Sequence, residues 1–433
     1  MKKMLMLGTS YGSIEMIRYA KKKGAYTIVT DYLEPEKSPA KYEADEYWMI
    51  NTSELDFLEE KCRKEQINAI VCGVSEFNLE ICMKLCNRLN LPCYCNEVAW
   101  SYSRDKEKFK SLCKRLGAQV ATDYFLSDAL TREELEKVIF PVVVKPVDMS
   151  GNRGISFCHN VEELVEAYRY AKSVSKSDKI IVERMLHGKE WYAYYAMAEG
   201  RISLVALNAM HSQPGEPRNC YSITTTVSDN VERYIEEMNP YVIKILEEAG
   251  CKEGIGWVQF MLDEDGKFYI LEMGYRLDGD MMFIPYREVR GFDSVEWLVD
   301  FAFGKKNRAK ELPEDQTHAF VKCGVGYMLW TNKSGIIAEI QGLDEVAEWP
   351  EIQLVESLAR IGDPITIHRS LGNIMFTADN CDEMCRVIKK INETIRILNT
   401  EGENVVIHYD NFDYLKEIYQ KGLSERDAFG VRL

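Results

Sequence analysis

The segment of residues 140–190 constrains the fold more than any other part of the chain. It begins with the apolar run Phe140–Val144, which predicts a short buried strand that delivers Lys145 at its end. A second apolar run, Lys179–Val182, predicts another strand, which ends at Glu183. The segment therefore predicts two buried strands that each present a charged side chain at one end.

A small-residue loop, Asp148–Gly154, follows the first of these strands. Its candidates for phosphate contacts are Ser150, Gly151, Arg153 and Gly154. Backbone N–H groups and a guanidinium can lie over phosphate oxygens, although a hairpin turn needs the same glycines. With Lys145 and the acids Glu183 and Glu190, the loop completes what a nucleoside triphosphate site requires. The chain has no G-x-x-x-x-G-K-[ST] pattern, so a P-loop is excluded.

Composition excludes several classes of protein. A chain of 433 residues predicts two to four domains. The formal charge of −15 argues against a nucleic-acid partner, which would require a basic surface. No apolar run approaches the roughly 20 residues of a membrane span, and the apolar part of the N-terminus is too short for a signal peptide. We expect a cytoplasmic protein with neither a membrane nor a nucleic acid as partner.

The thirteen cysteines are expected to be free thiols in the core. Two pairs, Cys82/Cys86 and Cys381/Cys385, have the spacing of one helical turn, and no C-x-x-C pair is present. The sequence therefore does not predict a zinc site.

The first 95 residues alternate between apolar strands and amphipathic helices. Strands are predicted at Met4–Leu7, Tyr26–Thr30 and Ala69–Cys72. This alternation predicts a parallel, doubly wound sheet. Farther along, we expect a charged helix at Ser101–Leu116 that contains Lys106, and a long helix near Asn230–Ala249.

A β-hairpin is predicted at Gly256–Glu272, around the turn Asp263–Gly266, because Asp-Gly is a strong turn signal. Gln259 and Glu272 are then within one position of being direct cross-strand partners, so both could bind one ion. A carboxylate and an amide oxygen are hard ligands of the kind that Mg²⁺ prefers. Strands are also predicted at Ala319–Leu329 and Gly335–Gly342.

Taken in order along the chain, these features resemble the ATP-grasp superfamily, in which ATP is held between two α+β lobes. The residues that carry the resemblance are Lys106, Lys145, the loop 148–154, Glu183, Glu190, Gln259, Glu272 and Arg276. The trailing segment Ser334–Val346, with Gly362-Asp363, is similar to the C-terminal domain of the carboxylate–amine ligase branch. The resemblance implies an α/β and α+β fold with a Rossmann-like domain (residues 1–95), an ATP-grasp domain of two lobes (96–306) and a lid-like α+β domain (307–433).

The resemblance also implies a role for each residue. Lys106 and Lys145 would bind phosphates, Glu183 would be the hinge acid, and Glu190 would bind the ribose. The backbone of Arg184, Met185 and Leu186 would contact adenine. Gln259 and Glu272 would hold Mg²⁺ or Mn²⁺, and Arg276, with Lys145, would be catalytic. The family often has Glu-x-Asn-x-Arg where this chain has Glu272-Met-Gly274-Tyr-Arg276, so one metal ligand is missing. Either only one metal ion binds, or the role of the missing asparagine passes to Asp278 or Asp280.

The expected function is an ATP-dependent ligase that joins a small carboxylate to an amine and releases ADP and phosphate, with a homodimer as a possible assembly. One alternative is a bicarbonate-phosphorylating enzyme that resembles biotin carboxylase or carbamoyl-phosphate synthase. A second alternative, raised by Gly274, is a regulatory protein that binds ATP without catalysis.

Overall fold

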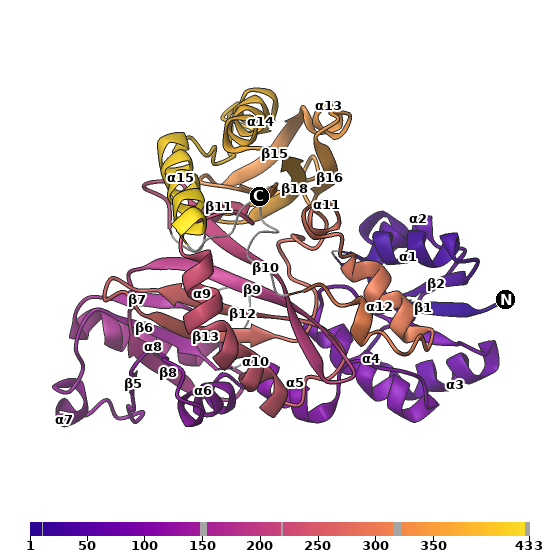
Figure 1. The fold of residues 1–433 in the computed structure, drawn as a ribbon, viewed down its shortest axis with the longest axis horizontal. Helices are drawn as coiled ribbons and strands as arrows, with labels where there is room; N and C mark the ends of the chain where they lie inside the picture. Colours follow the sequence, from indigo (N-terminus) through magenta and orange to yellow (C-terminus); the bar gives the residue numbers. More distant parts are fainter. Residues whose placement is uncertain (11, 148–153, 218–219, 315–321, 429–433) are drawn as a thin grey trace.

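The computed structural model describes residues 1–10, 12–147, 154–217, 220–314 and 322–428 (Figure 1). Its N-terminal part is a parallel sheet in the order β3-β2-β1-β4, as the alternation of strands and helices predicted. The elements of this part are β1 (Lys3–Leu7), α1 (Ser13–Lys22), β2 (Tyr26–Thr30), η1 (Pro35–Lys37), α2 (Ala40–Glu43), β3 (Glu46–Trp48), α3 (Leu55–Glu65), β4 (Ala69–Val71) and α4 (Glu76–Leu89).

A small antiparallel sheet in the order β5-β8-β6-β7 follows. Its elements are β5 (Asp123–Tyr124), α7 (Arg132–Leu135), β6 (Val142–Pro146), β7 (Ser156–Cys158), α8 (Val161–Val174) and β8 (Ile180–Arg184). Val142, Val144 and Val182 on the strands pack with Leu164 of α8 into a core of their own. This lobe thus has a core separate from the main one, and it holds the two strands predicted around Lys145.

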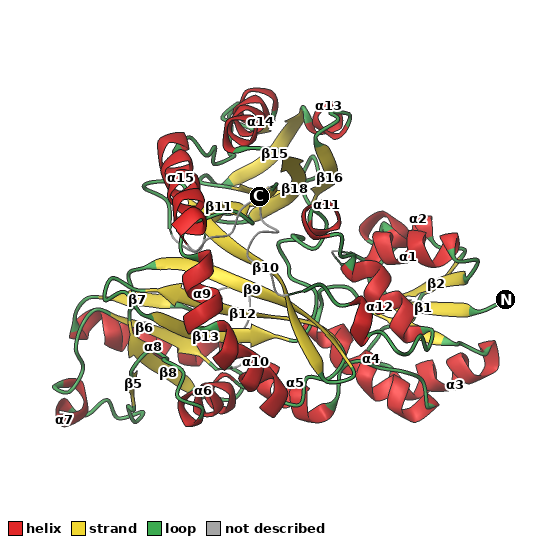
Figure 2. Ribbon diagram, in the orientation of Figure 1, coloured by secondary structure: helices red, strands yellow, loops and turns green. Residues whose placement is uncertain are grey.

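The largest sheet has eight antiparallel strands in the order β13-β12-β9-β10-β11-β14-β18-β16 (Figure 2). The strands are β9 (Lys189–Ala198), β10 (Arg201–Ser212), β11 (Tyr221–Thr225), β12 (Gly254–Leu262), β13 (Phe268–Gly274), β14 (Cys323–Trp330), β16 (Ile352–Ser357) and β18 (Ser370–Ala378). The sheet continues past residue 307, so the second and third of the expected domains share it. The division into three domains remains our proposal.

The other elements cover or connect these sheets. They are α5 (Glu97–Arg104), α6 (Lys106–Arg115), α9 (Val231–Glu237), α10 (Asn239–Glu248), α11 (Tyr286–Arg290), α12 (Ser294–Ala302), η2 (Ala309–Glu311), β15 (Gly335–Gln341), α13 (Leu343–Ala347), β17 (Pro364–Ile365), α14 (Cys381–Thr394), β19 (Arg396–Asn399) and α15 (Phe412–Ala428). β17, β15 and β19 form a small third antiparallel sheet. In the described residues, no helix is long and apolar enough to cross a membrane.

Two helices that the sequence predicts as continuous are each divided. Asp105 has an extended backbone, and its side chain accepts a hydrogen bond from the N–H of Lys108, so α5 ends and α6 begins there. The expected helix at Asn230–Ala249 is divided at Met238, two residues before Pro240, which has no N–H to donate. In both cases the hydrophobic periodicity continues across the break, so it could not reveal the boundary.

Candidate active site

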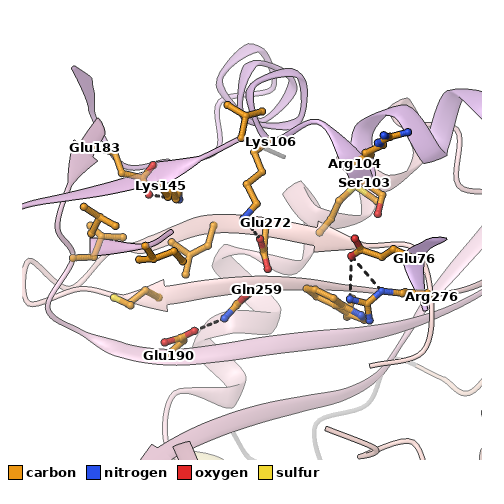
Figure 3. Close-up of a pocket in the computed structure, with 18 of the residues that line it drawn as sticks. Glu76, Ser103, Arg104, Lys106, Lys145, Glu183, Glu190, Gln259, Glu272 and Arg276 are labelled. Carbon is orange, nitrogen blue, oxygen red and sulfur yellow. Dashed lines mark hydrogen bonds and ion pairs between the residues drawn. The ribbon is translucent and has the colours of Figure 1, made fainter. Parts of the chain in front are cut away.

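A cavity of about 480 Å³ lies between the small sheet and the β12–β13 edge of the large sheet (Figure 3). Its volume is in the range of sites for small molecules and cofactors. Nine of the residues that the sequence predicts at the site line this cavity: Lys106, Lys145, Glu183, Arg184, Leu186, Glu190, Gln259, Glu272 and Arg276. Residues from a span of 170 positions in the sequence are therefore brought into one cavity.

The cavity is more basic than the rest of the chain. Six basic and five acidic side chains line it, whereas the whole chain has 54 basic and 69 acidic residues. Cations in a partly enclosed, low-dielectric site attract anions more strongly than cations in open solvent. The charge of the cavity therefore suits a polyanionic ligand better than the rest of the protein does.

Lys145 and Glu183 form an ion pair inside the small sheet. Val143 is the partner of Glu183 across β6 and β8, so Lys145, two residues later, lies diagonally opposite on the same face. The second oxygen of Glu183 lies 2.7 Å from Nζ of Lys110 on α6. Burial alone would raise the pKa of Glu183, but the two lysines lower it to about 2. Glu183 is therefore a buried carboxylate that stays ionised and fixes Lys145 at the cavity wall.

Glu272 and Gln259 are direct partners across the β12–β13 hairpin, which confirms the predicted hairpin and brings both side chains to the cavity. Oε2 of Glu272 lies 2.9 Å from Nζ of Lys106, at the first residue of α6. Burial would raise the pKa of Glu272, but Lys106 is close enough to lower it. The side-chain amide of Gln259 donates a hydrogen bond to Glu190. An ionised carboxylate beside an amide oxygen is a donor set that fits Mg²⁺ or Mn²⁺.

Arg276 lies at the opposite end of the cavity from Lys145, with Lys106 and Glu272 between them (Figure 3). Nη2 of Arg276 is 3.0 Å from Oε1 of Glu76 at the start of α4. Its guanidinium is 5.2 Å from the centre of the Trp257 ring, within the range of a cation–π contact. The guanidinium is thus held by an acid and an aromatic ring, so little conformational freedom is lost when it meets an anion.

The three residues predicted to contact adenine with their backbone differ in how they lie relative to the cavity, and the contact remains a prediction. Met185 does not line the cavity, and its N–H donates to the carbonyl of Pro141. The N–H of Arg184 likewise donates to the carbonyl of Thr122, 2.8 Å away. These two backbone N–H groups are therefore already paired within the protein, so neither is free to donate to a base. The side chains of Arg184 and Leu186 do line the cavity.

The loop predicted to cover phosphates is only partly described. Ser150, Gly151 and Arg153 lie outside the described residues. Gly154 has φ +81°, and a Cβ there would lie 2.9 Å from Pro146 and 2.8 Å from Val174. The backbone conformation and the lack of space both require glycine at this position.

Gly274, where the family motif often has asparagine, is also fixed by packing. Trp257 is its partner across the hairpin, and a Cβ on Gly274 would lie 2.2 Å from the indole ring. The two carboxylates considered as replacements do not line the cavity. Asp278 accepts a hydrogen bond from the Tyr192 hydroxyl, and Asp280 accepts one from another tyrosine. Among the described residues that line this cavity, Glu272 and Gln259 therefore remain the candidate metal ligands.

Restoring the family residue should damage the protein. We expect Gly274→Asn to lower stability by about 1–3 kcal/mol, because the new side chain must displace Trp257. The double variant Gly274→Asn/Trp257→Ala should recover part of that loss. Thermal unfolding of both variants checks the prediction. A Gly274→Asn protein with an unchanged melting temperature and increased turnover would contradict it.

Three residues at the site were not predicted from the sequence. Glu76 pairs with Arg276 across 200 positions, and Trp257 lies under the same guanidinium, so neither leaves a local signal. Lys110 could have been found, because it follows Lys106 by four residues and so shares its helix face.

Comparisons with known proteins agree with this geometry. Residues 105–309 match the family model described as the carbamoyl-phosphate synthase L chain, ATP binding domain. The chain is 24% identical over 303 residues to the carbamoyl phosphate synthase large chain of Clostridium beijerinckii, covering 68% of this chain and 27% of that protein. The aligned part thus spans about a quarter of that relative.

Two solved structures are similar along almost the entire chain. The L-amino acid ligase of Bacillus licheniformis has a TM-score of 0.75 at 19% identity, covering 92% of this chain and 99% of that one. The biotin carboxylase domain of 2-oxoglutarate carboxylase from Hydrogenobacter thermophilus, in complex with MgADP and bicarbonate, has a TM-score of 0.74 at 21% identity, covering 98% of each chain.

The two sheets, the cavity between them and these likenesses define an ATP-grasp fold. Residues 105–309 match an ATP-binding domain of this kind, and the chain as a whole has the ATP-grasp fold. The resemblance predicted from the sequence is confirmed at this level.

Proposed function

We propose that the chain is an ATP-dependent ligase that activates a small carboxylate as an acyl phosphate and joins it to an amine. The observation that carries the proposal is the order of charged groups along one cavity. The Lys145–Glu183 pair lies at one end, Lys106 faces Glu272 in the middle, and Arg276 lies at the other end (Figure 3). This order supports a nucleotide with its base near Glu183 and its last phosphate near Arg276.

In this proposal the carboxylate oxygen of the acid attacks the γ-phosphorus of ATP, and ADP leaves. The amine nitrogen then attacks the acyl carbon, loses a proton, and phosphate leaves. Lys145 and Lys106 offset the negative charge of the phosphates, and Arg276 stabilises the charge that develops on the transferred group. When bound at Glu272 and Gln259, Mg²⁺ would neutralise and orient the terminal phosphates.

The ion pairs of the site would have to change partners on binding. Glu272 is paired with Lys106, so a metal at Glu272 would release Lys106 toward the phosphates. Each cation that gives up a carboxylate gains a phosphate, which keeps the charges inside the cavity paired. The site thus suits a ligand in which the phosphates and the metal ion bind together, as in MgATP.

The alternatives predict different requirements for phosphate release. A ligase should release ADP only when both an organic acid and an amine are present. The bicarbonate alternative is suggested by relatives such as carbamoyl phosphate synthase, and it predicts ATP cleavage that depends on bicarbonate alone. A regulatory protein should bind ATP and release nothing under either condition. A homodimer is proposed by analogy with the biotin carboxylase domain, whose structure is described as a dimer.

A substrate screen tests the proposal. We expect ADP release, followed with a coupled assay, to rise when amino acids and small carboxylic acids are supplied in pairs, and to stay at background with bicarbonate alone. Turnover that depends only on bicarbonate would replace the ligase with the bicarbonate enzyme. Binding of ATP without turnover under any condition would favour the regulator.

A further inference from the structure

A group of cysteines, of which Cys93 is only partly buried, lies beside the N-terminal sheet and away from the nucleotide cavity. Five of the thirteen cysteines fall within residues 72–95. The sulfur atoms of Cys82, Cys86 and Cys93 all lie within 4.8 Å of one another, and those of Cys82 and Cys86 are 4.0 Å apart. Across the described residues, no other set of three cysteine, histidine or acidic side chains meets the same criterion for a metal site.

The local fold explains how these thiols meet. Cys82 and Cys86 are one turn apart on α4, so they share a face of the helix. Asn90 has φ 56°, the left-handed conformation that ends a helix, and the N–H of Leu91 then bonds back to the carbonyl of Cys86. This reversal returns the chain along the helix and places Cys93 against the pair.

A fourth cysteine, Cys72, follows β4 and lies beside the three, although its sulfur is not within 4.8 Å of all of them. A cavity of about 10 Å³, lined by Cys72, Cys82 and Cys93, lies between α4 and α12. That volume is about the size of a single small guest, and its other walls are apolar.

The distances suit a tetrahedral metal ion. Four thiolates about 2.3 Å from a zinc ion are about 3.8 Å from one another. The observed separation of 4.0 Å between Cys82 and Cys86 needs only a small rotation to reach that value. A disulfide would require two sulfur atoms about 2 Å apart, which is half the observed separation.

We propose that Cys82, Cys86 and Cys93, joined by Cys72 through a small movement of its side chain, bind one structural Zn²⁺ ion and release their thiol protons. Four sulfur ligands in a closed site are typical of structural zinc. The ion would fix the segment that ends at Cys95. The carbonyl of Tyr94 in that segment accepts a hydrogen bond from Tyr275, which follows β13, so the zinc would join the N-terminal sheet to the ATP-grasp domain.

The test is metal content of the full-length chain, purified with a reductant and without a chelator. We expect elemental mass spectrometry to give a zinc content of about one ion per chain. Cys86→Ala and Cys93→Ala should each lower the zinc content at least about tenfold. The matched control is Cys381→Ala, which removes a buried cysteine from the equally spaced pair on α14 and should keep the zinc.

A second measurement does not depend on any variant. After zinc is removed with a chelator, added Co²⁺ should give the thiolate-to-cobalt charge-transfer bands and the visible bands of a tetrahedral S₄ site. The proposal is overturned if the folded, reduced chain takes up neither zinc nor cobalt, if Cys381→Ala loses as much zinc as Cys86→Ala, or if the thiols are found as a disulfide. These readouts do not involve ATP, so they can fail while the ligase assignment holds.

Discussion

Replacing Glu272 with glutamine is expected to lower the rate of ADP formation by about 100- to 1000-fold, the scale of losing one preorganised electrostatic contact in a transition state. Glutamine has the shape of glutamate, but it lacks the charge that would hold a metal ion near the transferring phosphate. The fold should tolerate the change, because Glu272 is only partly buried and its one described ion pair is with Lys106.

The control for this variant is Glu264→Gln, which removes an exposed carboxylate from the turn of the same hairpin. We expect normal melting temperatures for both variants and normal turnover for Glu264→Gln alone. Partial recovery of Glu272→Gln at high Mg²⁺, or with Mn²⁺, would agree with a weakened metal site. Full activity of Glu272→Gln at ordinary Mg²⁺ would remove the metal role from this residue.

Lys145→Ala should weaken nucleotide binding by about 2 kcal/mol, or about 30-fold in Kd, because it removes one charge-assisted contact to phosphate. The variant should remain folded, because Glu183 keeps its second partner, Lys110, at 2.7 Å and is not left as an unpaired buried charge. Calorimetric titration with MgATP or MgADP measures the change directly and needs no knowledge of the other substrates.

Lys137→Ala is the matched control, because Lys137 is an exposed lysine whose one described ion pair is with Glu133 on the surface. It should bind nucleotide as the parent chain does. If Lys145→Ala binds with unchanged affinity, Lys145 does not contact phosphate, and the assignment of the whole cavity is undermined.

Much of the site could be predicted from the sequence because its residues follow strong local signals. The Asp-Gly turn fixes the β12–β13 hairpin, and the hairpin register makes Gln259 and Glu272 direct partners. The apolar strands β6 and β8 place Lys145 and Glu183 on one face. In each case the position of a charged side chain follows from the geometry of a single pair of strands.

The remainder depends on contacts between distant segments, which no local pattern records. Glu76 meets Arg276 only after the N-terminal part packs against the large sheet. The glycine at position 274 looks like a lost ligand in the sequence, and only the packing of Trp257 explains it. The cysteine group was missed for the same reason, because Cys93 lies outside the helix that carries Cys82 and Cys86.

The most direct test of the ligase assignment is to trap the activated acid. Hydroxylamine should intercept an acyl phosphate and give a hydroxamate, detected by mass spectrometry, that requires ATP, Mg²⁺ and the organic acid but no amine substrate. The Glu272→Gln variant should form almost none. We predict that the hydroxamate formed is that of the acid that supports ADP release in the substrate screen. Bicarbonate-dependent cleavage of ATP, with no hydroxamate from any organic acid, would contradict the proposed function.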